Sequence, residues 1–270
     1  MSGINTNLNS LTAQRNLSMT ANSLATSMAR LSSGLRVNSA KDDAAGLAIA
    51  ERMDSQTRGM NVAIRNANDA ISLAQTAEGA LAAISNNLQR MRELAVQASN
   101  GTNSSADVAS LDNEFQLLSQ ENARVAAATT FNNQSVIGSG GVTFTFQVGA
   151  NAVSANDQIS VTATSYTGTT TSLGTASSTA FSQISLLDAD INTVTSARAT
   201  WGANQNRFDT VIANLRVGAE NSAAAHGRIM DADYAAETAN LSRAQVLQQA
   251  GTAMVAQANQ APQSVLALLR

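Results

Sequence analysis

The stretches LSMTANSLATSMARLSSGL (residues 17–35) and LQQAGTAMVAQANQAPQSVLAL (residues 247–268) carry the same helical pattern, one near each end of the chain. Apolar residues recur there at alternating steps of about four and three positions, which places them on one seam of a helix. In the first stretch the seam consists of Leu17, Ala21, Leu24, Met28, Leu31 and Leu35. In the second stretch it consists of Leu247, Ala250, Met254, Ala258, Ala261, Val265 and Leu268.

The apolar pattern continues to the last residues, where chains are usually polar and frayed. Residues 265–270 read VLALLR. The few apolar side chains of one terminal helix do not offset the entropy that is lost when the helix is ordered. We therefore predict that both terminal segments are disordered in the monomer and fold when many copies pack together.

Composition restricts the class of protein. Of the 270 residues 13% are charged, the formal net charge is −3, and Lys41 is the only lysine. Nucleic-acid binding needs a clustered basic face, and a membrane surface attracts a polybasic patch, so we expect neither partner. The sequence also lacks cysteine, an ordinary secretory signal and an apolar stretch long enough to span a bilayer. Aromatic residues make up 3%, which disfavours a core built on aromatic anchors.

Helical spacing dominates the chain. A long helix is expected after Asp42 and Asp43, either of which can cap it. Asn100-Gly101 ends this helix, and a further helix follows as the second arm of an antiparallel hairpin. After a short β-segment and a polar tract, helical spacing resumes with Leu187, and a last helix runs from about Asp233 to the end of the chain.

The helical period is interrupted once. Residues 143–148 and 158–163 alternate polar and apolar side chains around a turn-rich segment, which predicts a β-hairpin over residues 142–163. Residues 165–180 form a Ser/Thr/Gly tract that we interpret as an exposed loop. The predicted fold class is mainly α, with long antiparallel helices in coiled-coil bundles and a small β-hairpin insert.

Candidate catalytic and metal-binding patterns are weak. His226 is the only histidine, and without cysteine or further histidines it has no partners for a metal site. The pairs Asp42-Asp43 and Asp231/Asp233 are better explained as helix caps than as acid–base pairs. Residues 138–141 lack the GK[ST] ending of a phosphate loop. We therefore predict no catalytic residue, no metal ligand and no cofactor.

Several long runs resemble those of bacterial flagellins. They are RLSSGLRVNSAKDDAAG at residues 30–46, RNAND at 65–69, LQRMRELAVQ at 88–97, SRAQVLQQAG at 242–251 and the closing QANQ to LR at 257–270. The resemblance covers about the first 135 and the last 85 residues. Large flagellins carry variable domains between these halves, so the chain is similar to a short form that lacks them.

The resemblance implies a division into two domains. Residues 1–35 and 233–270 would form an inner coiled-coil layer that lines a central channel. Residues 44–232 would form an outer layer, including the β-hairpin 142–163 and a short variable loop at 165–180. Polymerisation would then use a set of apolar terminal residues: Leu24, Met28, Leu31, Leu247, Met254, Val265, Leu266, Leu268 and Leu269.

The resemblance also implies function and partners. The chain would polymerise with itself into the filament that drives swimming, outside the cell, after export by the flagellar type III apparatus. An export chaperone would bind the C-terminal helix, and hook–filament junction and filament cap proteins would contact the filament. Host Toll-like receptor 5 would bind a strip made of Leu88, Gln89, Arg90, Leu94, Gln97 and Glu114. Cytosolic receptors of the NAIP class would sense Leu266, Leu268 and Leu269.

Three alternatives remain open at this point. A hook–filament junction protein shares the terminal helices, although the unbroken runs at Arg90–Val96 and Ala250–Arg270 favour a flagellin. A secreted hydrolase built on flagellin ends would need an inserted catalytic domain, for which the 40-odd residues between the two halves leave no room. The third alternative is a soluble immune ligand, a role that would be a consequence of the surface and not the purpose for which the chain assembles.

Overall fold

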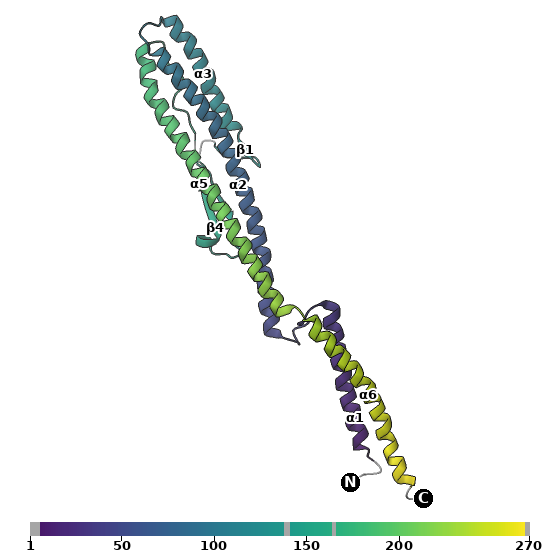
Figure 1. The fold of residues 1–270 in the computed structure, drawn as a ribbon. Coiled ribbons are helices and arrows are strands. Elements are labelled where there is room, and N and C mark those ends of the chain that lie inside the picture. The colour runs from purple at the N-terminus through teal and green to yellow at the C-terminus, as the bar shows by residue number, and fades with distance from the viewer. Residues whose placement is uncertain (1–5, 138–140, 164–165, 268–270) are drawn as a thin grey trace. The chain divides into compact units, whose positions relative to one another are not determined.

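The structure is a computed structural model that describes residues 6–137, 141–163 and 166–267, with side chains described as far as residue 260. Helices account for most of the chain, in agreement with the predicted class (Figure 1). The elements in chain order are α1 (Leu8–Ser33), α2 (Ala44–Ala98), α3 (Ser105–Ala128), β1 (Thr130–Phe131), β2 (Gln134–Ser135), β3 (Thr143–Gln147), α4 (Ser154–Asp157), β4 (Gln158–Thr162), α5 (Ser177–Met230) and α6 (Tyr234–Ala267).

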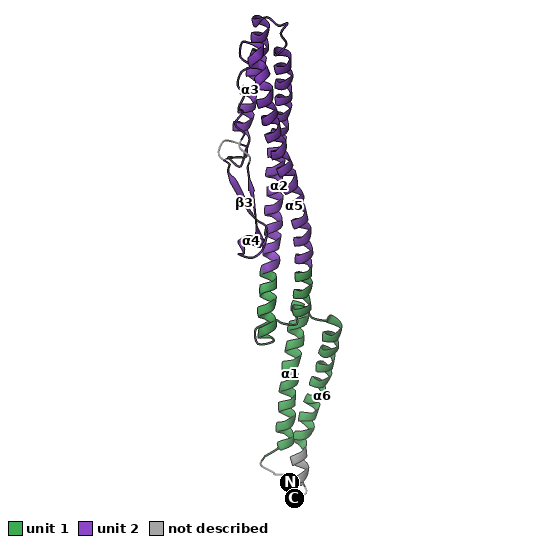
Figure 2. Cartoon of the chain, turned by 90° about the vertical axis from the view of Figure 1, so that its left-hand side faces the viewer, with its two compact units in different colours: residues 1–55, 221–270 green, residues 56–220 purple. Residues whose placement is uncertain are grey.

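Two compact units divide the chain (Figure 2). The first consists of Met1–Ser55 and Asn221–Arg270, and the second of Gln56–Glu220. Residues 44–55 and 221–232 therefore group with the terminal helices, whereas the domain division expected from the sequence put them in the outer layer. The physical reason is a small apolar cluster of the first unit, in which Val37, Ala50 and Met230 are buried together.

Gln56–Glu220 is built around a core shared by α2, α3, α5 and the hairpin. α2 contributes a stripe of small and large apolar residues at three- and four-residue steps, which allows its neighbours to pack closely. The fully buried anchors include Phe115 of α3 and Trp201 and Phe208 of α5. The expectation of a core without aromatic anchors was thus wrong, because the few aromatic residues are concentrated in this one unit.

The predicted β-hairpin is present. β3 and β4 pair antiparallel from Thr143 opposite Thr162 to Gln147 opposite Gln158. Phe144, Ile159 and Val161 point into the core, while the intervening polar residues are exposed. Phe146 contacts Phe208 of α5 edge to face, with ring centroids 5.5 Å apart. A second, two-residue hairpin between β1 and β2 was not foreseen, and it turns at Asn132 and Asn133, both at positive φ.

The Ser/Thr/Gly tract is not a free loop in its described part, residues 166–180. Tyr166, Thr170 and Leu173 are buried. Two carboxylates on neighbouring helices hold the segment: Asp112 of α3 accepts the Leu173 N–H at 2.7 Å, and Asp190 of α5 accepts the Thr169 hydroxyl at 2.9 Å. The Ser/Thr/Gly composition of the tract predicts an exposed loop and gives no indication of these hydrogen bonds to distant residues.

In the first unit, α1 and α6 lie side by side and antiparallel (Figure 1). Ser10 near the start of α1 donates its hydroxyl to Asn259 Oδ1 near the end of α6 at 2.7 Å. The segments that follow α1 and α5 are joined by backbone hydrogen bonds, from Arg36 N to Met230 O at 2.6 Å and from Ala232 N to Gly34 O at 2.9 Å. The bases of the two terminal helices are therefore tied together.

Candidate assembly and recognition surfaces

Capping residues define the ends of the terminal helices. The Asn7 side chain accepts the Ser10 N–H at 3.1 Å at the start of α1, and Gly34 ends this helix at φ 74°. A left-handed residue at this position is commonly glycine, because a Cβ is disfavoured there. Asp233 caps α6 by accepting the Ala235 N–H at 2.9 Å. Of the two candidate caps of α2, Asp43 accepts the Gly46 N–H at 2.8 Å.

The contact between α1 and α6 is made by a mixture of small, polar and aliphatic residues. The least exposed positions of α6 follow four- and three-residue steps: Glu237, Leu241, Ala244, Gln248, Gly251, Val255 and Ala258. The facing positions of α1 are Ser10, Ala13, Leu17, Thr20, Leu24, Ser27 and Leu31. Among the described side chains of α1, the buried ones are Ser10 and Ser27. This helix pair therefore buries little apolar surface.

Several of the larger apolar residues of both helices point away from this seam. Of the apolar residues predicted to lie on the two seams, Met28 is 56% exposed, Leu247 51% and Met254 62%, whereas Leu17, Leu24 and Leu31 do face α6. Leu24 and Leu31 lie half-buried against α6. The side chains of Val265 and Leu266 are not among those described, and Leu268 and Leu269 lie outside the described residues.

Both terminal helices expose further apolar residues that the sequence reading missed. They are Leu8, Leu11, Met19 and Val246, between 51% and 66% exposed. The open faces border two grooves between α1 and α6, of about 710 and 810 Å³. Leu247 lines both grooves, and Met254 lines the second.

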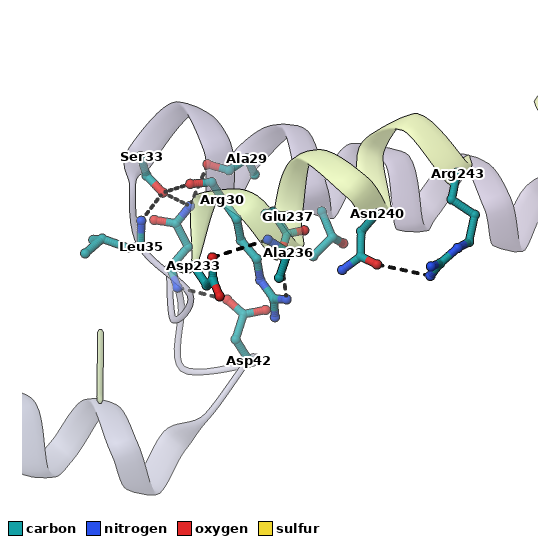
Figure 3. Close-up of polar contacts among 12 residues, drawn as sticks. Ala29, Arg30, Ser33, Leu35, Asp42, Asp233, Ala236, Glu237, Asn240 and Arg243 are labelled. Atoms are coloured by element: carbon teal, nitrogen blue, oxygen red, sulfur yellow. Dashed lines mark hydrogen bonds and ion pairs between the residues drawn. The ribbon is translucent and has the colours of Figure 1, made fainter. Parts of the chain in front are cut away.

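A polar cluster lies at the base of the α1–α6 pair (Figure 3). Arg30 Nη1 of α1 is 3.8 Å from Glu237 Oε2 of α6. Asp42 accepts the N–H groups of Asn38 and Ser39 at 3.1 and 2.9 Å. The Ser39 hydroxyl, the Asn38 N–H and the nearby Arg30 charge lower the pKa of the Asp42 carboxyl. Asp42 is therefore ionised and stabilises the turn before α2, rather than capping that helix.

The predicted receptor strip divides into a buried and an exposed part. Leu88 and Leu94 are fully buried in the core, because they face α3 and α5 with the apolar stripe of α2. In this conformation they are not available to a partner. Gln89, Arg90, Gln97 and Glu114 are exposed. The strip that a partner can reach is thus polar.

Arg90 links the two helices of this strip. Its Nε donates to Glu114 Oε1 of α3 at 2.9 Å, and its Nη1 donates to Glu93 Oε2 at 3.0 Å. These two hydrogen bonds raise the pKa of the Arg90 guanidinium. A neighbouring ion pair joins Arg92 Nε to Asp188 Oδ1 of α5 at 2.7 Å, and sequence spacing gave no signal for it. The strip is a charged surface held across three helices.

Both halves of the chain match models of known protein families. The family model of the bacterial flagellin N-terminal helical region matches residues 4–139, and that of the C-terminal helical region matches residues 184–269. The chain belongs to the flagellin family. The resemblance seen in its sequence motifs is thereby confirmed.

Individual proteins similar to this chain are also flagellins. A flagellin of Halalkalibacterium halodurans is 45% identical over 271 residues, covering 99% of each chain. A flagellin of Xenorhabdus nematophila is 41% identical over 312 residues, again covering 99% of each chain. Flagellin B of Vibrio cholerae aligns over 371 positions, with 34% identity. The longer alignments show that this chain is a short form.

A solved structure supports the fold. The crystal structure of Bacillus cereus flagellin is 37% identical, with a TM-score of 0.51, and the match covers 56% of this chain and 88% of that one. Flagellins are structural proteins, and family membership makes the chain a self-polymerising subunit of the extracellular flagellar filament that serves motility. Among the described helices, none combines the length and hydropathy that a membrane crossing requires.

Proposed function

We propose that copies of this chain assemble through the open apolar faces of α1 and α6. The observation that carries the proposal is the exposure of Met28, Leu247 and Met254, three large apolar side chains that the contact between α1 and α6 leaves uncovered. A folded protein rarely leaves so many large apolar side chains open unless a partner covers them. Two grooves along the pair offer space for side chains of a second copy.

In this proposal, the terminal segments 1–35 and 233–270 form an inner layer around a channel. Residues 44–232 form an outer layer, with the hairpin at 142–163 and the tract at 165–180 away from the channel. The sequence adds Val265, Leu266, Leu268 and Leu269 to the apolar residues proposed for assembly. The supporting fact is the apolar heptad pattern that both ends of the chain share.

Seeded growth tests the assembly surface. The double substitution L247S/M254S should abolish elongation on filament seeds, because it replaces two exposed apolar residues while leaving the contact between α1 and α6 unchanged. The control is F181S, which removes an even more exposed apolar residue (71%) from the other unit. Electron microscopy and sedimentation measure growth. Normal elongation of L247S/M254S would contradict the proposal.

We further propose that the soluble chain is a ligand of Toll-like receptor 5. The observation that favours this second role is the exposed strip of Gln89, Arg90, Gln97 and Glu114, in which Arg90 is held by two carboxylates. Charged, positioned arginines are frequent anchors at protein interfaces. Leu88 and Leu94 would act from beneath the strip by fixing α2.

The remaining partners follow from the same apolar ends. An export chaperone would cover α6 before secretion through the flagellar type III apparatus, and junction and cap proteins would contact the two ends of the filament. NAIP-class receptors would sense Leu266, Leu268 and Leu269. No catalytic activity is proposed, because the functional surfaces are contacts between chains.

A further inference from the structure

The turn between α2 and α3 holds the only Asn-Gly pair of the chain, Asn100-Gly101. Both residues are exposed. The Asn100 carbonyl accepts the Asn103 N–H at 3.2 Å, which closes a turn with Gly101 as its second residue. The closing hydrogen bond does not use the Gly101 N–H, and no acceptor for this N–H is found among the described residues. The Gly101 nitrogen is therefore open to solvent and to its neighbour.

The side-chain amide of Asn100 is also unconstrained, in contrast to those of other loop asparagines. Asn103 donates its Nδ2 to the Gln97 carbonyl at 2.7 Å, and Asn38 donates its Nδ2 to Ser33 Oγ at 3.0 Å. Within the part of the chain that the structure describes, the Asn100 amide has no hydrogen bond. Its carbonyl carbon Cγ is therefore free to rotate toward the Gly101 nitrogen.

Glycine at position 101 makes this approach possible. A Cβ on the residue after an asparagine shields the backbone nitrogen, and glycine has none. No neighbouring atom lies within 4 Å of the position that a Cβ of Gly101 would take, so the surroundings do not shield the nitrogen either. Because the two reacting groups belong to adjacent residues, the reaction is intramolecular and has a high effective concentration.

We propose that Asn100 is a site of spontaneous deamidation. The Gly101 nitrogen loses its proton to hydroxide and attacks Cγ of Asn100. The N–Cγ bond forms, the Cγ–Nδ2 bond breaks, and ammonia leaves after taking a proton from water. The product is a cyclic succinimide. The proposal is independent of the assembly and receptor roles proposed above.

Water then opens the succinimide at one of its two carbonyl carbons. Attack at Cγ gives aspartate in an ordinary backbone. Attack at the main-chain carbonyl gives isoaspartate, in which the backbone runs through Cβ and the former main-chain carbonyl becomes a free carboxylate. The net reaction consumes one water and releases one ammonia, with no oxidation or reduction.

Both products should loosen the end of α2. Isoaspartate adds a backbone carbon before Gly101, which shifts Asn103 relative to its two acceptors, the carbonyls of Gln97 and Asn100. Either product also places a negative charge just beyond the C-terminus of α2, where the helix dipole disfavours it. The formal net charge of −3 becomes more negative by one unit for each event.

Peptide mass spectrometry of the full chain tests the proposal. The soluble protein is incubated at physiological temperature in neutral and in mildly alkaline buffer, and an unincubated sample gives the background of the digestion. Trypsin releases residues 93–124 as one peptide, in which Asn103, Asn113 and Asn122 are internal controls. Asn100 should react at least about tenfold faster than these, and faster still in alkaline buffer, where the nitrogen loses its proton more readily.

Gly101→Ala is the variant that tests the role of the open nitrogen. Alanine fits, because the added Cβ meets no atom and Gly101 is not among the residues at positive φ. Deamidation of Asn100 should fall by at least about tenfold, since the methyl group shields the nitrogen. The matched control is Gly79→Ala in α2, which also adds a Cβ in open space and should leave the rate unchanged.

The effect on α2 is measured by hydrogen exchange of residues 95–99. The incubated chain should exchange faster there than freshly prepared N100D, which has the new charge but an ordinary backbone. Isoaspartate itself is detected with an isoaspartyl methyltransferase and S-adenosylmethionine as methyl donor. N100Q is the blank, because its longer side chain does not close the same ring.

Equal conversion of Asn100 and Asn103 within the one peptide would overturn the proposal, and this comparison needs no variant. Undiminished conversion in Gly101→Ala would overturn it as well, provided that circular dichroism shows an unchanged helix content. Methyl incorporation that is the same in N100Q and in the unaltered chain would exclude isoaspartate at this site. Unchanged exchange of residues 95–99 after incubation would contradict the loosening of α2.

Discussion

Asp190 of α5 accepts hydrogen bonds from both the backbone N–H and the hydroxyl of Thr169, at 3.2 and 2.9 Å. Asp190 is 7% exposed, so these bonds lie in the interior of the unit. They fasten the tract that follows the hairpin onto the helices. A segment whose composition is typical of a loop is thereby made part of the core.

Asp190→Asn should destabilise this unit. The amide NH₂ cannot accept the hydrogen bonds that Thr169 donates to both carboxylate oxygens, and a buried unsatisfied donor or acceptor costs about 1–3 kcal/mol. Urea unfolding followed by circular dichroism measures the loss. The control is Asp188→Asn, which alters an exposed contact with Arg92 and should change stability little. Equal midpoints for the two variants would contradict the buried role of Asp190.

The stability of the same unit should fall at high pH. Burial, together with the nearby Asp190 charge, raises the pKa of Tyr166 from 10.0 to about 12. The folded state therefore keeps the phenol proton more tightly than the unfolded state. Stability contributed by this difference is complete below about pH 10 and is lost as pH rises toward 12.

Tyr166→Phe tests this pH dependence. The variant should show a smaller decrease of the free energy of unfolding between pH 10 and 12, because its ring has no proton to lose. Urea unfolding at a series of pH values measures the slope. If the slope is the same with and without the Tyr166 hydroxyl, the assignment fails.

Arg90→Asp should weaken receptor signalling by the soluble chain by about tenfold or more, since an arginine anchor is replaced by a charge of opposite sign. A cell-based reporter assay for Toll-like receptor 5 measures the effect. Arg124→Asp is the matched control, because Arg124 is also exposed and ion-paired on one of the same two helices. Unaltered signalling by the Arg90 variant would remove the site assignment.

Truncation before Val265 should leave secretion possible and impair polymerisation. The shortened chain keeps the described α1–α6 contacts but loses the terminal apolar residues of the proposed inner layer. Secretion is measured by the amount of chain in the culture medium, and polymerisation by seeded growth. Abundant, stable filaments from the truncated chain would refute the role given to this end.

Much of the fold follows from local pattern. Residues close together in the sequence predict the long helices, the turn at Asn100-Gly101 and the β3–β4 hairpin. The helices and the hairpin follow from the spacing of apolar residues, and the turn follows from a helix-breaking Asn-Gly pair. Local pattern does not identify the face of α1 that contacts α6, because each of the two helices carries apolar residues on more than one face. The seam contains Ser27 and Gly251, which a search for apolar heptads passes over, and leaves Met28 and Leu247 outside.

The geometry of the predicted receptor strip could likewise not be derived from local sequence pattern. Arg90 and Glu114 were identified by resemblance, but their direct contact requires α2 and α3 to lie in one particular register. The burial of Leu88 and Leu94 likewise depends on packing against other helices. Fixed contacts at long sequence separation, such as Asp112 with Leu173, leave no periodic signal at all.

Hydrogen exchange of the terminal helices tests the central claim most directly. In dilute monomer, amides of α1 and α6 should exchange rapidly, because the pair buries little apolar surface. In seeded filaments the same amides should become strongly protected, while amides in the core of residues 56–220 are protected in both states. Slow exchange of α1 and α6 in the isolated chain, together with failure to elongate seeds, would contradict the account.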